Sequence, residues 1–288
     1  MTEPVWTVSA ALDWTREYLT QKGDEHPRRS AEWLLSAATG LSRIELYAFH
    51  DRPLTADERR VLRDAVRRRA AGEPLQYVTG EVAFRHIVVR VRPGVLIPRP
   101  ETEILVGEVL AYLEGADESV VVDLCTGSGC IALSVAHEHP GVTVHATDLS
   151  PLGVEVAAQN AQRLGLSDRV LISEGDLFAG VEVALKGRVD VVVSNPPYIP
   201  SDDVVKLPAE VAGFEPHLAL DGGPDGLAIF RRILSDAREW LVPGGLLAVE
   251  LDERTVKTAA EEALQWYEHV RSVRDLTGRD RVLLARLP

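Results

Sequence analysis

The sequence contains little cysteine and no grouping of residues that is typical of a metal site. Its two cysteines, Cys125 and Cys130, do not form a C-x-x-C pair. This spacing argues against a disulfide framework and against a zinc knuckle. The eight histidines are scattered along the chain, and we therefore predict that the protein holds no metal ion.

Long apolar runs are also missing. No stretch approaches the roughly 18 apolar residues that a membrane-spanning helix needs. The N-terminus lacks a basic segment followed by an apolar run, which is the pattern of a secretory signal. We therefore expect no membrane association and a cytoplasmic location.

Positive charge is scarce, because 31 Lys+Arg stand against 44 Asp+Glu for a net charge of −13. Neutralising phosphates needs clustered basic side chains, so this balance argues against strong binding to nucleic acid. One basic concentration exists, the run Arg67–Arg69 with Arg59, Arg60 and Arg63 before it. We interpret it as a solvated helix face, with a partner-binding patch as the alternative. The expected oligomeric state is a monomer.

A length of 288 residues allows one large α/β domain and a smaller one. Up to residue 72 the apolar residues recur with a helical period, over about 8–19, 31–38 and 54–69. Gly40 and Gly72 follow the second and third of these segments, and Thr55 with Glu58 forms a capping box for the third. We predict that residues 1–72 form a small helical bundle that recognises a partner, with simple packing support as the alternative.

Residues 73–95 have a different pattern. Tyr77–Thr79 and Phe84–Val91 are rich in β-branched and aromatic residues, and Gly80 lies between them. Such runs around a glycine are typical of a β-hairpin or a short extended segment. We predict a β-hairpin linker here.

Residues 96–288 alternate between apolar β-branched runs and helical segments, a pattern that predicts an α/β domain with a parallel sheet covered by helices on both faces. Two further runs, Val270–Val273 and Val282–Ala285, are joined by a short segment containing Gly278. This short connection predicts a hairpin and therefore an antiparallel edge strand. The predicted parallel strands are Val120–Leu124, Val142–Thr147, Val170–Ser173, Val189–Val193 and Leu246–Leu251.

The first of these strands runs into a turn that contains Gly127 and Gly129, and a helix follows. Glycine lets a backbone approach a ligand closely, as in nucleotide-binding strand–turn–helix units. The turn departs from the dinucleotide pattern G-x-G-x-x-G, because the third position is Ala132, and it lacks the phosphate-loop pattern. A glycine-containing turn alone therefore predicts a ligand site without choosing the ligand.

Asp148 ends the second predicted strand, about 25 residues after Asp123 at the end of the first. An acidic residue at this position can accept hydrogen bonds from both hydroxyls of a ribose. More than one class of nucleoside cofactor carries such a ribose, so this residue does not identify the cofactor. The alternative interpretation is a helix N-cap before Pro151. Both roles can coexist.

The sequence Asn195-Pro196-Pro197-Tyr198 follows the fourth predicted strand. The Asn195 side-chain oxygen and the Pro196 backbone oxygen can accept two hydrogen bonds from one planar NH2 group. The prolines fix the loop and offer no competing backbone N–H, and Tyr198 can stack on a planar group. The motif thus predicts a site for a planar amino or amide nitrogen, with a simple proline turn as the alternative.

The order of these motifs, with Asp176-Leu177 between the last two, resembles that of seven-stranded methyltransferases that modify planar nitrogens. Nearly the whole chain is similar to the bacterial peptide chain release factor N5-glutamine methyltransferases, the PrmC/HemK family. Three further segments carry the likeness: Ile97–Glu103, Glu215–Leu227 and Asp275–Arg281. The first of them favours this family over the enzymes that methylate a ribosomal-protein glutamine.

The resemblance implies a class I, Rossmann-like S-adenosylmethionine methyltransferase domain over residues 96–288 that methylates the glutamine of the Gly-Gly-Gln motif in release factors. Asn195, Pro196 and Tyr198 would be catalytic and, with Pro197, would bind the substrate. Asp148 would bind the ribose, Asp176 and Leu177 would lie near the adenine, and Thr102 would lie near the methionine end. The complete implied cofactor set is Thr102, Asp123, Cys125, Thr126, Gly127, Ser128, Gly129, Asp148, Leu149, Asp176, Leu177 and Asn195.

Two positions depart from the family pattern. Cys125 stands where the family usually has glycine, so we expect the first turn to adopt a conformation that a side chain tolerates. Residues 250–255, Glu-Leu-Asp-Glu-Arg-Thr, replace the family's Glu-Ile-Gly and a later glutamine, and no role is assigned to them.

Two other functions remain open from the sequence. Methylation of adenine in DNA or RNA uses the same Asn-Pro-Pro-Tyr geometry on a flipped base, although the negative charge opposes it. A non-catalytic module that binds cofactor and partner is the other alternative, and the intact Asn195 and Tyr198 argue against it.

Overall fold

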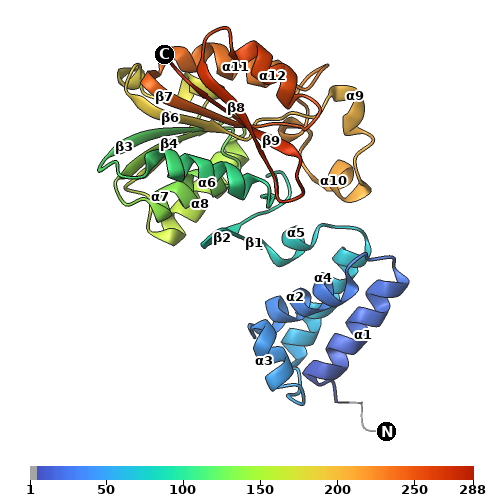
Figure 1. Cartoon of the computed structure of the whole chain (residues 1–288). Helices are drawn as coiled ribbons and strands as arrows, with labels where there is room; N and C mark the ends of the chain where they lie inside the picture. The colour runs from blue at the N-terminus through green and yellow to red at the C-terminus, as the bar shows by residue number, and fades with distance from the viewer. Residues whose placement is uncertain (1–4) are drawn as a thin grey trace. The chain divides into compact units, whose positions relative to one another are not determined.

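The computed structural model describes residues 5–288, and these form two compact units (Figure 1). The first unit comprises the described residues up to Glu81 together with Pro208–Phe214. The second comprises Val82–Leu207 and Glu215–Pro288. The compact units divide between residues 81 and 82. The domain boundaries that we expect from the sequence, after residues 72 and 95, stay predictions.

The first unit is a bundle of helices around its own apolar core. The expected helices are confirmed, the second ends at Gly40 with a left-handed backbone, and the Thr55–Glu58 capping box is present. A short helix that the sequence did not predict, α3, begins with a second capping box between Ser42 and Glu45. The helices are α1 (Val8–Gln21), α2 (Pro27–Thr39), α3 (Arg43–Ala48), α4 (Ala56–Ala70) and α5 (Leu75–Thr79).

The prediction of an extended chain at Tyr77–Thr79 was wrong, because this segment is the helix α5. Pro74 precedes the helix, and Gly80 ends it with φ of 82°. Leu75 and Tyr77 are buried, and Leu75 belongs to the bundle core. Tertiary burial therefore outweighs the β preference of the local sequence. The hairpin is confined to β1 (Glu81–Phe84) and β2 (Ile87–Arg90), which form a two-stranded sheet.

A seven-stranded sheet organises the second unit within the described chain, in the order β5-β4-β3-β6-β7-β9-β8. The strands β5, β4, β3, β6 and β7 pair in parallel, which confirms the predicted parallel sheet. Their bounds are β3 (Ser119–Leu124), β4 (Val142–Asp148), β5 (Val170–Glu174), β6 (Val189–Ser194), β7 (Leu241–Glu250), β8 (Glu268–Arg274) and β9 (Asp280–Arg286).

The last two strands form the predicted hairpin, but their placement corrects the expectation of an antiparallel edge strand. β9 pairs antiparallel with both β7 and β8, so the antiparallel strand lies inside the sheet and β8 forms the edge. The burial of each strand agrees with this order. Val282–Ala285 of β9 are buried, whereas β8 has no buried residue.

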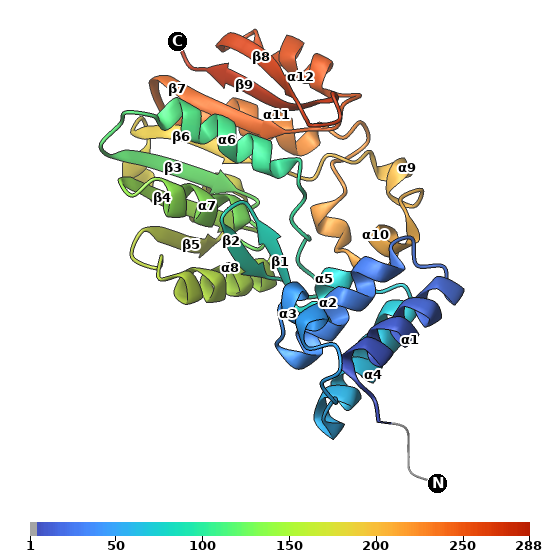
Figure 2. The same cartoon turned by 60° about the horizontal axis from the view of Figure 1, so that its bottom comes forward.

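Helices cover both faces of the sheet, as Figures 1 and 2 show. On one face lie α6 (Thr102–Leu113), α7 (Cys130–Glu138) and α8 (Pro151–Leu164), and on the other lie α11 (Ala228–Asp236) and α12 (Val256–Ala263). Short helices occupy the connections: α9 (Ser201–Val204), α10 (Ala209–Phe214), and the 3₁₀ turns η1 (Leu177–Gly180), η2 (Val183–Leu185), η3 (His217–Ala219) and η4 (Ala237–Glu239). Within residues 5–288, no helix has the length and apolar content needed to cross a membrane.

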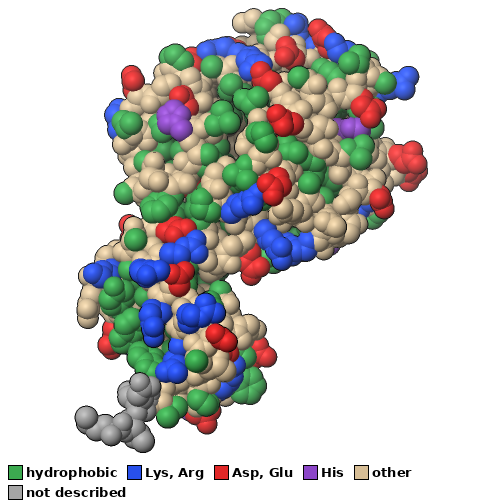
Figure 3. Space-filling model, turned by 180° about the vertical axis from the view of Figure 1, so that it is seen from behind, with side chains coloured by type: hydrophobic (Ala, Val, Ile, Leu, Met, Phe, Trp, Pro, Cys, Tyr) green, Lys and Arg blue, Asp and Glu red, His purple; other side chains and the backbone are tan. Residues whose placement is uncertain are grey.

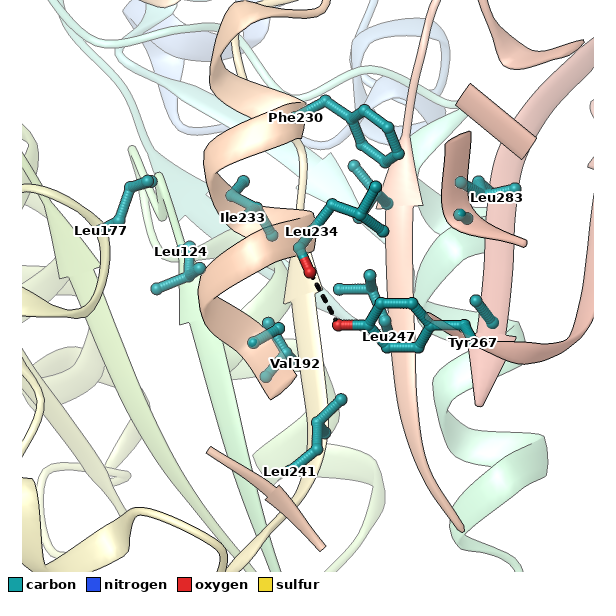
Figure 4. Packing of buried hydrophobic residues seen from close by; sticks show 14 of the residues in the cluster. Leu124, Leu177, Val192, Phe230, Ile233, Leu234, Leu241, Leu247, Tyr267 and Leu283 are labelled. Carbon is teal, nitrogen blue, oxygen red and sulfur yellow. Dashed lines mark hydrogen bonds between the residues drawn. The ribbon is translucent and has the colours of Figure 1, made fainter. Parts of the chain in front are cut away.

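The core under α11 shows why this helix packs on the sheet. Phe230, Ile233 and Leu234 recur at helical spacing and are buried against the strands. Figure 4 shows them on the helix beside the strands that carry Val192, Leu247 and Leu283. The Tyr267 hydroxyl donates a hydrogen bond of 3.0 Å to the Leu234 carbonyl, which satisfies its buried polar end.

The basic run on α4 divides into two groups. The Arg60 and Arg67 side chains are 73% and 79% exposed, as a solvated helix face predicts, whereas Arg69 is taken up by contacts inside the first unit. Arg67 pairs with Asp64, and Arg68 pairs with Glu73. Arg69 points inward, where its guanidinium contacts Asp24 at 2.7 Å and Glu210 at 3.1 Å. Figure 3 shows basic and acidic side chains mixed over the visible face of this unit. Arg69 therefore belongs neither to a solvated helix face nor to an open basic patch.

We predict that Arg69→Met lowers the free energy of unfolding by about 3 kcal/mol, because it leaves Asp24 buried without its cation. Only 4% of the Asp24 side chain is exposed. Urea titration followed by circular dichroism measures the change. The matched variant Arg67→Met, at a side chain 79% exposed, should change it by less than about 0.5 kcal/mol. Equal costs for the two variants would contradict this distinction.

Candidate active site

A pocket in the second unit lies at the carboxyl ends of the central parallel strands. Leu124 of β3 stands in register with Thr147 of β4 and with Ser194 of β6, so the residues that follow these strands meet at one edge. The strand order also reverses at β3, where open α/β sheets bind their ligands. The predicted site residues that line the pocket are Thr102, Cys125, Thr126, Gly127, Ser128, Asp148, Leu149, Asp176, Leu177, Asn195 and Pro197.

Four predicted residues are close to the pocket in sequence but are not part of its wall: Asp123, Gly129, Pro196 and Tyr198. Asp123 is fully buried beneath the turn, where its Oδ2 accepts hydrogen bonds from the Thr126 hydroxyl (2.6 Å) and the Ala132 amide (3.2 Å). Its Oδ1 has no hydrogen-bond partner among the described residues. Asp123 thus ties the two ends of the turn together, and its direct part in cofactor binding stays a prediction.

The glycines of the turn serve different purposes. Gly127 has φ of 56° with open space around its α-carbon, so its absent side chain gives conformational freedom. Gly129 has φ of 81°, and an added Cβ would lie 3.2 Å from the Cβ of Ala157. Gly129 therefore also lets α7 and α8 approach each other closely.

Asp148 is held in place by backbone groups on both sides. Its Oδ2 accepts from the Gly127 amide at 2.7 Å, and its Oδ1 accepts from the Ser150 amide at 2.8 Å. Burial raises its pKa, and these two hydrogen bonds act against that shift. The alternative interpretation as a helix N-cap was wrong, because Ser150 caps α8 through the Gly153 amide.

The opposite wall of the pocket is formed by the segment after β5. Leu177 has φ of 52°, and its carbonyl accepts a hydrogen bond of 2.8 Å from the buried Thr147 hydroxyl. Asp176 is half-exposed and pairs with Arg232 of α11 at 2.9 Å. This segment therefore gives the pocket an apolar side chain, Leu177, next to a half-exposed carboxylate, Asp176.

Asn195 lies at the end of β6 with a defined amide orientation. Its Nδ2 donates a hydrogen bond of 3.1 Å to the Thr102 hydroxyl at the start of α6. Among the described residues only its Nδ2 is engaged, so the Asn195 Oδ1 is free to accept a hydrogen bond from a ligand. The Tyr198 hydroxyl lies 3.3 Å from Glu250 Oε1, and its ring packs against the core.

Glu250 lies beside Tyr198 without lining the pocket, and the sequence patterns did not single it out. It ends β7, and its neighbour Val249 stands in register with Ser194, which places Glu250 level with Asn195. Burial raises its pKa to about 7, and the hydroxyls of Thr102 and Tyr198 act against that shift. The sequence did offer one indication of Glu250, because it is an acidic residue at the end of the fifth predicted parallel strand.

The donor set of the pocket fits S-adenosylmethionine. Carboxylates (Asp148, Asp176) stand beside apolar walls (Leu149, Leu177), which suits a nucleoside with free ribose hydroxyls and a cationic sulfur. In the part of the chain that the structure describes, no three His, Cys, Asp or Glu side chains are grouped as a metal site.

Comparison with known proteins decides the family. The PrmC N-terminal domain model matches residues 10–80, and the methyltransferase small domain model matches residues 102–209. A release factor glutamine methyltransferase of Geobacter sulfurreducens is 47% identical over 86% of this chain and 84% of the relative. The chain belongs to the release factor glutamine methyltransferase family. A relative of the same name from Moorella thermoacetica is 44% identical over 97% of this chain and 98% of its own length.

Solved structures agree on the fold. The catalytic domain of hMettl16, in complex with an RNA hairpin, is 16% identical with a TM-score of 0.55 over 68% of this chain and 74% of that one. The N-terminal domain of human METTL16, in complex with SAH, has a TM-score of 0.51 at 17% identity over the same shares. The predicted class I methyltransferase fold is thereby confirmed for this member of the release factor glutamine methyltransferase family.

Both departures from the pattern of the release factor glutamine methyltransferase family have a structural account. Cys125 keeps a glycine-type backbone with φ of 60°, so the expectation of a conformation that suits a side chain was wrong. In the second departure, Arg254 contacts Asp252 at 2.8 Å and Asp203 of α9 at 2.9 Å. Arg254 thereby links the loop after β7 to the segment that follows Tyr198.

We predict that Cys125→Gly raises the free energy of unfolding by up to about 1 kcal/mol. A left-handed backbone costs an L-residue roughly 1–2 kcal/mol, which exceeds the entropy that glycine adds to the unfolded chain. Guanidinium unfolding measures the change. The control Cys125→Ala keeps the strain and should give no gain, and a gain of equal size in both variants would contradict the strain.

We predict that Asp123→Asn makes stability less dependent on pH. Burial raises the pKa of Asp123 from 3.8 to about 7, so the folded protein binds a proton that the unfolded chain has lost over this range. Wild-type stability should therefore fall relative to the variant as pH rises from about 4 to 7. Urea midpoints for both proteins, taken at steps across this window, test the sign. A constant difference across the window would show that Asp123 does not titrate there.

Proposed function

We propose that this protein transfers a methyl group from S-adenosylmethionine to the side-chain amide nitrogen, N5, of the glutamine in the Gly-Gly-Gln motif of peptide chain release factors. The observation that carries the proposal is the orientation of Asn195. Its amide nitrogen is engaged by Thr102, which leaves its oxygen free beside the pocket that the cofactor fits. Family membership supports the choice of glutamine over adenine.

The cofactor would rest on residues 125–129, with Asp148 at the ribose, Leu149, Asp176 and Leu177 around the adenine and Thr102 at the methionine end. When bound, it supplies an electrophilic methyl group. Asp148 would enter this role with its two oxygens already fixed by the Gly127 and Ser150 amides. Such preorganisation lowers the entropy lost on binding.

The glutamine nitrogen is a weak nucleophile because its lone pair is shared with its carbonyl. Asn195 Oδ1 and the Pro196 carbonyl would each accept one of its N–H groups and so orient the nitrogen. These acceptors also stabilise the positive charge that develops on nitrogen. Pro197, which lines the pocket, would contact the planar amide, and stacking by Tyr198 stays a prediction. No strong base is needed, because the nitrogen becomes acidic once it is methylated.

The first unit would recognise the release factor, since a protein-sized substrate needs more contact area than one loop supplies. A cytoplasmic location would suit a partner that acts in translation. The monomeric state and the weakness of nucleic-acid binding stay predictions.

The test is mass spectrometry of a purified release factor after incubation with this protein and isotopically labelled S-adenosylmethionine. We expect one labelled methyl group on the Gly-Gly-Gln glutamine. Asn195→Ala should reduce the label by at least about 100-fold, because the removed acceptor contacts the reacting nitrogen. A cofactor-binding protein that labels adenine in DNA or RNA, and no release factor, would overturn the proposal.

A further inference from the structure

Two loop segments of the second unit line the pocket without a part in the mechanism above. The α6 segment, residues 94–101, precedes the helix α6, and the α11 segment, residues 215–227, precedes the helix α11. Leu96 and Pro98 of the first and Pro216, Leu218 and Asp221 of the second line the pocket. The two segments lie more than a hundred residues apart in the sequence, so a specific contact must bring them together.

The carboxylate of Glu215 makes this contact. Its Oε2 accepts a hydrogen bond of 3.3 Å from the Ile97 amide, and its Oε1 accepts one of 2.5 Å from the Arg99 guanidinium. The same guanidinium donates to the Ile97 carbonyl at 2.9 Å. Only 2% of the Glu215 side chain is exposed, so its charge is buried and depends on these partners. We call Glu215, Arg99 and Ile97 the clasp.

From the clasp, the α6 segment leads by hydrogen bonds to Asn195. The Thr102 amide donates to the Arg99 carbonyl at 3.1 Å. The Thr102 hydroxyl in turn accepts a hydrogen bond of 3.1 Å from the Asn195 Nδ2. The position of Arg99 therefore decides where the hydroxyl that orients the Asn195 amide lies.

The α11 segment reaches the other end of the same loop. The Ile199 amide donates to the Leu220 carbonyl at 2.9 Å, and the Gly222 amide donates to the Ile199 carbonyl at 2.8 Å. The fit is close, because a Cβ added at Gly222 would lie 2.7 Å from the Tyr198 Cα. The α11 segment therefore supports the backbone of the loop directly after Tyr198.

We propose that Glu215 is a positioning residue for methyl transfer. By joining the α6 segment to the α11 segment, it holds the loop from Asn195 to Tyr198 at both ends and so keeps the acceptors of the substrate amide in place. This inference rests on the proposed glutamine methylation. Glu215 does not line the pocket, so it acts on the substrate through Arg99 and the two segments.

The cofactor side of the pocket is held by other contacts. The Gly127 and Ser150 amides fix the carboxylate of Asp148, and the Thr126 hydroxyl is bound to Asp123. The clasp takes part in none of these hydrogen bonds. Loss of the clasp should therefore misplace the acceptors of the glutamine amide while the affinity for S-adenosylmethionine stays nearly unchanged.

The experiment measures kcat of the full chain with a release factor and S-adenosylmethionine both saturating, and the Kd of S-adenosylmethionine by calorimetry. Glu215→Gln keeps the size of the side chain but removes the charge that strengthens both hydrogen bonds. It should lower kcat by about tenfold, because a small displacement of the orienting groups slows the reaction. The Kd should change by less than about twofold, as expected for groups that share no contact. Urea unfolding confirms that the variant is folded.

Glu138→Gln is the matched control, since it makes the same change at another glutamate that is paired with arginine. Glu138 accepts hydrogen bonds of 2.6 and 2.7 Å from the Arg85 guanidinium, its side chain is 15% exposed, and it does not line the pocket. This control should change kcat by less than about twofold.

A double-mutant cycle with Arg99→Gln tests the route. If Glu215 acts through Arg99, Glu215→Gln should cost much less than tenfold once Arg99 is already glutamine. Two residues that act independently would instead show costs that multiply in full.

The outcomes separate this inference from the proposed function. A wild-type enzyme that leaves the glutamine unmethylated would overturn both. A wild-type enzyme that methylates it overturns this inference alone in three cases: if Glu215→Gln keeps its kcat, if it weakens cofactor binding as much as it slows turnover, or if its cost multiplies in full with that of Arg99→Gln.

If Glu215→Gln does not fold, Arg99→Lys carries the test. Lysine keeps the cation beside Glu215 but lacks the planar fork that reaches the Ile97 carbonyl at the same time. A lower kcat with an unchanged Kd for S-adenosylmethionine supports the inference, and an unchanged kcat overturns it.

Discussion

The site depends on one constraint, the register of four parallel strands that end at the same level. β3, β4 and β6 align through Leu124, Thr147 and Ser194, and β7 continues the alignment through Val249. The residues that directly follow these strand positions therefore lie at one edge of the sheet, and no long loop is needed to bring them together. A shift of one residue in any strand would turn its last side chain to the opposite face of the sheet. The backbone hydrogen bonds of the sheet thus set the spacing of the backbone positions that carry the functional groups, independently of side-chain contacts.

The same edge concentrates buried acids, and their burial has a physical consequence. Asp123, Asp148 and Glu250 all have raised pKa values, with burial as the largest cause. Each accepts hydrogen bonds that the surrounding turns would otherwise lack: Asp123 from Thr126 and Ala132, Asp148 from Gly127 and Ser150, and Glu250 from Tyr198. These hydrogen bonds partly offset the cost of burying the carboxylates. They also hold the loops in one arrangement, which preorganises the binding site.

The sequence revealed those features whose chemistry lies within a few neighbouring residues. The strand-to-turn motif around Gly127 and the loop at Asn195 could be located because apolar periodicity marks a strand and the following residues mark its end. Glu250 also ends an apolar strand, but its position level with Asn195 depends on the pairing between β6 and β7, which its neighbours in sequence do not reveal. The helix α5 and the internal position of β9 were missed for a related reason, since tertiary packing decided both against the local pattern.

The residues that depart from the family pattern show how much freedom this edge leaves. Cys125 carries a side chain on a backbone with φ of 60°, so the turn keeps a left-handed conformation even where glycine is absent. In the second departure, Arg254 forms ion pairs with Asp252 and Asp203. Glu250, four residues earlier, is the glutamate of the family pattern. The two departures therefore concern the backbone strain of the turn and the outer contacts of the loop after β7. At Asn195 the constraint is tighter, because the hydrogen bond that its Nδ2 donates to the Thr102 hydroxyl decides which group of the amide is left free.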